Sequence, residues 1–136
     1  MKITLCSSST FFDKLPNISD ELERRTYQVF LPHPWNWSEK SEDEIRKVQS
    51  HLIRRHFKNI DESSAIYVAN YEKNGTSGYI GGNVFLEMGK AFDREIPIFL
   101  LYEVPKMNYR EELLALNPIV IGEDWNRLDQ ILKEEK

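Results

Sequence analysis

The chain has 136 residues, of which 40% are hydrophobic and 29% are charged. These are ordinary values for a soluble globular protein, and the length predicts a single domain over residues 1–136 with a sizeable core. The net charge of −4 and the isoelectric point near 5.4 argue against a surface that binds nucleic-acid polymers. A small anionic ligand is not excluded, because backbone dipoles can hold one on an acidic protein.

Cysteine content and hydropathy indicate the compartment. Cys6 is the only cysteine, so no internal disulfide is expected, and a reducing cytoplasm fits. No signal peptide is expected at the start, because the apolar stretch of residues 3–6 is followed by serines. The longest apolar runs, such as residues 96–102, are far shorter than a membrane span. We therefore expect a cytoplasmic protein without membrane contact.

Hydrophobic spacing predicts strands and helices in alternation. Short apolar runs predict strands at residues 2–6, 27–31, 65–69, 96–101 and 118–121. Helical spacing predicts a first helix with Leu15, Ile18 and Leu22 on its buried face, and Pro16 suits its first turn. Further helices are expected at residues 42–61, 82–94, 109–116 and 125–133.

The start of the predicted 42–61 helix carries its own signal. Ser41 and Glu44 have the spacing of a capping box, in which side chains satisfy the first N–H groups of a helix. We expect this helix to turn Ile45, Val48, Leu52 and Ile53 inward.

Alternating strands and helices are typical of an α/β fold with a parallel sheet covered on both faces. We predict a three-layer, doubly wound (Rossmann- or flavodoxin-like) sheet of five parallel strands, in the order 2-1-3-4-5. Ligands of such sheets bind beyond the carboxyl ends of the strands, where the strand order reverses. The loops at residues 6–12 and 70–82 should therefore face a common crevice.

The segment 78–91 (GYIGGNVFLEMGKA) reads as a glycine-rich turn that opens directly into a helix. Glycines let a ligand approach the backbone, and a helix start offers unpaired N–H groups. On a helical wheel, the buried stripe is expected to hold Val84, Phe85, Met88 and Phe92. Glu87 lies about 60° from Val84, at the edge of this stripe, so it is the candidate for an anionic nucleophile. The alternative is a solvated glutamate that the helix dipole favours.

Other polar and aromatic residues could complete a site. Ser7, Ser8, Ser9 and Thr10 could offer hydroxyl and N–H groups to a phosphate or sugar, or could simply form a turn. This loop has neither the dinucleotide fingerprint nor a phosphate-binding P-loop motif.

Flat side chains in the predicted loops suit a nucleobase. Tyr79, Trp35 and Trp37 could stack on a base, pack the loops together or fill a dimer interface. Cys6 resembles a small buried hydrophobic residue more than a reactive thiol. The three histidines, His33, His51 and His56, lack the spacing of metal ligands, so neither a metal site nor a cofactor is expected.

These motifs together resemble the nucleoside 2-deoxyribosyltransferase family, which includes the 2′-deoxynucleoside 5′-phosphate N-hydrolases. The resemblance covers a first strand that ends in a Cys-Ser loop (residues 5–8), the segment 60–69 and the glycine turn. It is strongest at residues 79–83 and 87–91, which are similar to the family pattern G-[ST]-x-x-E-[IM]-G-x-A.

The resemblance implies cleavage of an N-glycosidic bond in (deoxy)nucleosides or their 5′-monophosphates. Glu87 would attack the anomeric carbon, expel the base and form a glycosyl-enzyme that water or a second base resolves. By the same resemblance, Cys6, Ser7, Ser8, Tyr79, Gly81, Gly82 and Asn83 would bind the substrate. Family members are usually dimers or larger, so a homodimer or higher homo-oligomer is implied.

Two positions depart from the family pattern. Where family transferases carry an aspartate about four residues before the isoleucine that precedes the third strand, this chain has His56, four residues before Ile60. A histidine could protonate the leaving base near neutral pH. The polar position before the nucleophile corresponds to Gly81 or Gly82. The alternative to an enzyme is therefore a sensor module of the same fold that binds a nucleotide but has little or no activity.

Overall fold

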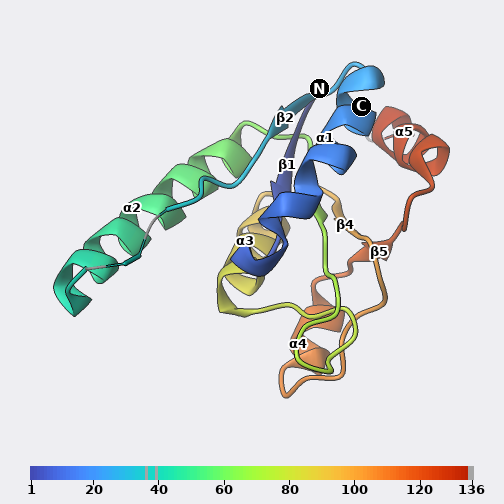
Figure 1. Ribbon diagram of the computed structural model, residues 1–136. Helices are drawn as coiled ribbons and strands as arrows, with labels where there is room; N and C mark the ends of the chain where they lie inside the picture. Colours follow the sequence, from blue (N-terminus) through green and yellow to red (C-terminus); the bar gives the residue numbers. More distant parts are fainter. Residues whose placement is uncertain (36, 39, 135–136) are drawn as a thin grey trace.

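The computed structural model describes residues 1–35, 37, 38 and 40–134. Five parallel strands form one sheet in the order β2-β1-β3-β4-β5 (Figure 1). The strands are β1 (Lys2–Cys6), β2 (Gln28–Phe30), β3 (Ala65–Val68), β4 (Ile98–Leu100) and β5 (Ile119–Val120). The predicted α/β fold and strand order are confirmed. The strands are one to three residues shorter than the apolar runs that predicted them, except β1, because ladder pairing ends where the loops turn away.

The helices follow the predicted alternation. They are α1 (Leu15–Arg24), α2 (Glu42–Asp61), α3 (Gly82–Asp93), α4 (Arg110–Ala115) and α5 (Trp125–Glu134). A short 3-10 helix, η1 (Ser9–Lys14), replaces part of the serine loop and was not predicted. Among the described residues, no helix combines the length and the hydrophobicity that crossing a bilayer requires.

Alternation along the strands divides the core into two halves. Ile3 and Leu5 of β1 face the layer that contains α1 and α5. Cys6 and the β3 residues Ile66 and Val68 face the opposite layer, which contains the buried sides of α2, α3 and α4. Helices therefore cover both faces of the sheet (Figure 1). This alternation places Cys6 on the same side as the glycine turn and its helix.

Helix α2 is longer than the sheet that it covers, and its first half extends away from the body of the molecule (Figure 1). Ser41 caps it as predicted, because its hydroxyl accepts a hydrogen bond from the Glu44 N–H at 3.2 Å. In this helix only His56 and Ile60, one turn apart, are buried. The expectation that Ile45, Val48, Leu52 and Ile53 turn into the core was wrong: these four are half-buried, because the sheet ends before it reaches them.

Helix α3 buries a narrower stripe than the helical wheel predicted. Val84, Met88 and Ala91 are buried, whereas Phe85 is half-buried and Phe92 is 47% exposed. The prediction was therefore wrong for Phe92, since Ala91 makes the contact with the sheet. The small Ala91 side chain lets the helix lie close to the strands.

Candidate active site

The loops that follow β1 and β3 enclose the main pocket of the described structure. Its volume is about 650 Å³, and it lies where the strand order reverses, as expected. Its walls come from the serine loop, residues 31–35 and 37, α2 from Gln49 onward, the glycine turn and the first turns of α3. Among its lining residues are Ser7, Ser8, Ser9, Phe12, His33, Trp35, Trp37, Arg55, His56, Tyr79, Gly81, Gly82, Asn83 and Glu87.

The buried side chain of Asn70, which is 1% exposed, holds the glycine turn in place. The Asn70 amide donates hydrogen bonds to the carbonyls of Gly78 and Tyr102 at 3.3 and 2.9 Å and accepts one from the Tyr102 N–H at 2.9 Å. Gly78 has a φ of +69°, and a Cβ atom there would lie 2.4 Å from the Glu103 carbonyl oxygen. Only glycine suits this position, and the fixed turn determines where α3 starts.

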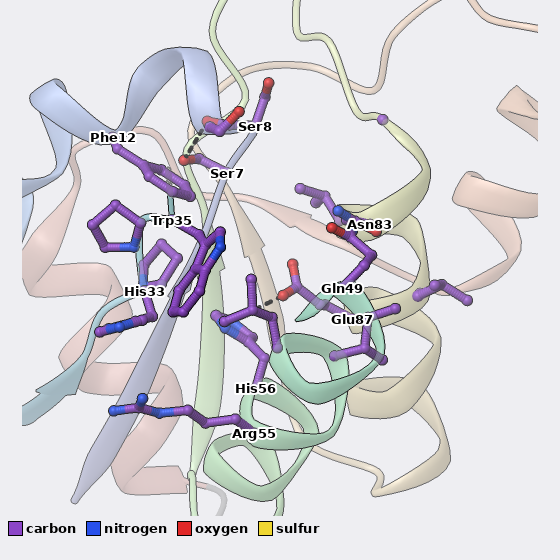
Figure 2. Close-up of a pocket in the computed structure, with 18 of the residues that line it drawn as sticks. Ser7, Ser8, Phe12, His33, Trp35, Gln49, Arg55, His56, Asn83 and Glu87 are labelled. Atoms are coloured by element: carbon purple, nitrogen blue, oxygen red, sulfur yellow. Dashed lines mark hydrogen bonds and ion pairs between the residues drawn. The ribbon is translucent and has the colours of Figure 1, made fainter. Parts of the chain in front are cut away.

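Glu87 points from α3 toward α2, and its side chain is only 13% exposed (Figure 2). Its Oε2 atom lies 3.0 Å from Nε2 of His56, whose side chain is 9% exposed. The alternative of a solvated glutamate is thus not observed. Both side chains line the pocket, so a ligand there would meet this pair.

Cys6 lies behind the pair, at the end of β1. Its Sγ atom is 3.7 Å from Nε2 of His56, and its thiol donates a hydrogen bond to the Glu87 carboxylate. Cys6 is fully buried and is not among the lining residues. The expected contact between Cys6 and a substrate is therefore replaced by a contact with Glu87, because the side chain faces the core rather than the crevice.

Burial determines the charge of the pair. Desolvation raises the pKa of Glu87 to about 8, and the Cys6 hydrogen bond only partly offsets it. Desolvation also lowers the pKa of His56 to about 4, although the Leu5 carbonyl accepts a hydrogen bond from the ring. Burial raises the pKa of the Cys6 thiol well above its usual value. Near pH 7 burial therefore favours the neutral forms of both side chains.

The serine loop and the glycine turn meet at the mouth of the pocket. Lys73 donates a hydrogen bond to the Ser8 hydroxyl at 3.2 Å, and its Nζ atom lies 5.0 Å from the centre of the Tyr79 ring. The Tyr79 ring rests on Gly81, where a Cβ atom would lie 3.0 Å from the phenol oxygen. Lys73 therefore brings a positive charge beside Ser8, at the edge of the pocket.

Aromatic side chains form the opposite wall. Phe12, His33 and Trp35 lie across the cavity from Glu87 and Asn83 (Figure 2). Trp35 is 44% exposed and Trp37 is 36% exposed, so neither is part of the core. Both tryptophans line the pocket. The space between this wall and Glu87 suits a flat ring attached to a sugar.

Most of the residues that the sequence singled out come together here. Ser7, Ser8, Tyr79, Gly81, Gly82 and Asn83 line the same pocket as Glu87 and His56. Sequence analysis missed two residues, Lys73 and Asn70. Lys73 lies in the loop between β3 and α3, where its charge could have suggested an anion; Asn70 gave no signal beyond its place at a strand end.

Comparison with known proteins adds to this geometry. No protein-family model and no curated protein matches the sequence. Among solved structures, a 2-deoxyribosyltransferase from Bacillus psychrosaccharolyticus superposes with a TM-score of 0.51 at 17% sequence identity. The match covers 74% of this chain and 71% of that protein. The fold is that of the 2-deoxyribosyltransferases.

A second solved structure has the same fold. A conserved protein from Enterococcus faecalis V583 also gives a TM-score of 0.51, at 18% identity, with 88% of this chain and 76% of that one covered. Both solved structures thus share the 2-deoxyribosyltransferase-like fold with this chain at low sequence identity.

The Glu87–His56 pair predicts how the stability of this 2-deoxyribosyltransferase-like chain depends on pH. The folded chain keeps the Glu87 proton up to about pH 8, whereas the unfolded chain releases it near 4.5. The folded state therefore binds more protons between these values and loses stability as the pH rises. We expect the free energy of unfolding to fall by about 1 kcal/mol between pH 7 and 8, measured by urea denaturation. The lowered pKa of His56 acts in the opposite direction, chiefly between about pH 4 and 6.5.

The control for this prediction is a pair of isosteric substitutions. Glu87→Gln should abolish the decrease in stability between pH 7 and 8, because the amide does not titrate. Glu23→Gln, at an exposed position of α1, should retain it. A decrease that survives in Glu87→Gln would show that another group causes it.

Proposed function

We propose that the chain cleaves or transfers the N-glycosidic bond of (deoxy)nucleosides or their 5′-monophosphates, with Glu87 as the nucleophile. The observation that carries this proposal is the Glu87–His56 pair, with 3.0 Å between carboxyl oxygen and ring nitrogen, on the wall of a pocket of about 650 Å³. A buried carboxyl group that faces a ligand-sized space is typical of a reactive site. We propose that the protein works in the cytoplasm, where Cys6 stays reduced.

His56 would control the proton of the nucleophile. In the first step, His56 accepts the Glu87 proton, and the resulting carboxylate attacks the anomeric carbon while the bond to the base breaks. The electron pair of that bond leaves with the base, which takes the proton from His56. In the second step, water or another base attacks the anomeric carbon, His56 takes its proton, and Glu87 is released. The hydrogen bond from the His56 ring to the Leu5 carbonyl keeps the other ring nitrogen aimed at Glu87.

Removal of the nucleophile provides the direct test. Glu87→Gln is expected to reduce base release by at least ~1000-fold, because the amide cannot form the glycosyl ester. The measurement is chromatographic detection of free base from a panel of deoxynucleosides and their 5′-monophosphates, with Glu23→Gln as the matched control. Equal rates in the two variants would reject Glu87 as the nucleophile.

One observation favours the second candidate, a nucleotide sensor without efficient chemistry. Burial holds Glu87 in its neutral form near pH 7, which makes it a poor nucleophile until His56 takes the proton. In that case the same panel would bind, as measured by calorimetry, and no base would appear. The panel therefore separates the enzyme from the sensor in one experiment.

The mouth of the pocket favours a 5′-monophosphate over a nucleoside. Ser7 and Ser8 follow β1 and line the pocket together with the first turn of α3, and Lys73 from the β3–α3 loop donates a hydrogen bond to Ser8. Such hydroxyl, ammonium and helix N–H groups are suited to a phosphate. We expect Lys73→Met to raise KM for a 5′-monophosphate about 10-fold, equivalent to roughly 1.4 kcal/mol, and to leave KM for the nucleoside unchanged.

The control for Lys73 is another lysine over an aromatic ring. Lys14 lies 4.5 Å from the centre of the Tyr71 ring and is not a lining residue of this pocket. Lys14→Met removes a similar charge and should leave both KM values unchanged. If Lys73→Met changes KM for the nucleoside and the monophosphate equally, the phosphate contact is rejected.

We further propose that the chain acts as a homodimer or larger homo-oligomer. Ile45 and Ile53 of α2 line a shallow hollow on its surface, and exposed Trp35 and Trp37 lie nearby on the main pocket. A second copy of the chain packed here would cover apolar surface and close the open side of the pocket.

Sedimentation of the purified chain tests this proposal. The wild-type chain should sediment as a dimer or larger, whereas Ile45→Asp should shift it toward the monomer, because a carboxylate would be buried at the contact. Lys47→Asp introduces the same group at an exposed position on another side of α2 and should not. A monomeric wild-type chain would overturn the proposal.

A further inference from the structure

Three side chains that can bind a metal, those of Cys6, His56 and Glu87, converge at the wall of the pocket. The Sγ atom of Cys6 lies 3.7 Å from Nε2 of His56, and that nitrogen lies 3.0 Å from Oε2 of Glu87. The ligating atoms of the three residues all lie within 4.8 Å of one another. They come from β1, α2 and α3, which are distant in sequence, so no spacing pattern along the chain revealed the cluster.

These distances suit a tetrahedral metal ion. With zinc bonds of about 2.3 Å to sulfur and 2.0 Å to nitrogen or oxygen, the ligand atoms of a tetrahedral site lie roughly 3.3–3.5 Å apart. The observed 3.0 and 3.7 Å lie on either side of this range. The third separation, between Cys6 Sγ and the Glu87 carboxyl group, lies within 4.8 Å, so the side chains would close around the ion to form the site.

We propose that Cys6, His56 and Glu87 bind a thiophilic divalent cation of the Zn²⁺ type, with a fourth coordination position open to the pocket. Thiolate and imidazole ligands select such metals over Mg²⁺ or Ca²⁺. His56 and Glu87 line the pocket and Cys6 lies behind them, so the remaining vertex faces the cavity. Structural zinc sites are usually closed by four protein ligands, whereas this cluster supplies three and leaves one position open.

Charge balance supports a cation in this buried place. On binding, the Cys6 thiol and the Glu87–His56 pair each release one proton to solvent, which leaves a thiolate, a carboxylate and a neutral imidazole. Their charge of −2 cancels that of the cation, so the filled site is neutral and its burial costs little. The Leu5 carbonyl, which accepts a hydrogen bond from the His56 ring, orients the imidazole as the outer partners of metal-bound histidines do.

The metal site has a consequence for catalysis that rests on the proposed function. A carboxylate bound to a cation cannot attack a sugar carbon, and a metal-bound His56 nitrogen cannot carry a proton. Zn²⁺ should therefore inhibit base release, and a chelator should restore it. The cation would act as a reversible inhibitor at the nucleophile itself.

The test uses Co²⁺ as a spectroscopic substitute for Zn²⁺. The full chain, reduced and treated with EDTA that is then removed, is titrated with Co²⁺ while the near-ultraviolet and visible spectra are recorded. We expect one Co²⁺ per chain, with a thiolate-to-metal charge-transfer band and the visible bands of a tetrahedral site. Zn²⁺ should remove these bands by displacement.

Variants assign the bands to the cluster. Cys6→Ser should abolish the charge-transfer band, and His56→Gln should weaken Co²⁺ binding at least ~10-fold. His51→Gln changes an exposed histidine of the same helix and should bind as the wild type does. Circular dichroism checks folding; if one cluster variant does not fold, the other still decides. Absence of the bands in the wild type, or unchanged binding in the folded cluster variants, would overturn the proposal.

The metal site and the proposed function fail in different ways. If no substrate releases base but the Co²⁺ bands appear and depend on Cys6, the metal site stands and the glycosidase is rejected. If base release depends on Glu87 but no Co²⁺ binds, the enzyme stands and the metal site is rejected.

Discussion

The main constraint on this pocket is the burial of the Glu87 carboxyl group beside a single ring nitrogen of His56. Desolvation makes an ionised Glu87 costly and favours its protonated form, which lies 3.0 Å from the His56 ring nitrogen. That arrangement requires a neutral imidazole with one nitrogen free to accept, and the Leu5 carbonyl supplies it by occupying the ring N–H. The cost of burial is thus offset by contacts from two other elements.

The topology explains how three distant segments reach one point. Parallel strands bring the ends of β1 and β3 together where the strand order reverses. The helices before and after β3 along the chain, α2 and α3, contribute His56 and Glu87. The pleat of β1 sends Cys6 to the face that both helices cover. Asn70 then fixes the glycine turn against the loop that follows β4, so that α3 starts at a defined place. The edge of the sheet and the buried Asn70 amide therefore determine where α3 and its Glu87 lie.

The strand order, the capping of α2 and the shared crevice were accessible from the sequence, because they depend on local periodicity and on general rules of α/β topology. The wheel placed Glu87 at the edge of the buried stripe, which is where it lies. The contact of Cys6 with Glu87 was not accessible, because it depends on how α3 is rotated about its axis against β1. Ile45 and Phe92 were assigned to the core for a related reason: periodicity reveals an apolar face but not how far the sheet extends beneath it.

The two walls of the pocket differ in what they contribute to the rest of the molecule. The wall with Glu87 and His56 is continuous with the core around β1 and β3, whereas Leu31 and Trp35 on the facing wall are 45% and 44% exposed. Substitutions in residues 31–35 and 37 therefore remove little packing energy, while they alter the shape that a ligand encounters. A change of ligand preference through substitutions in that segment would leave the folding stability and the Glu87–His56 pair intact.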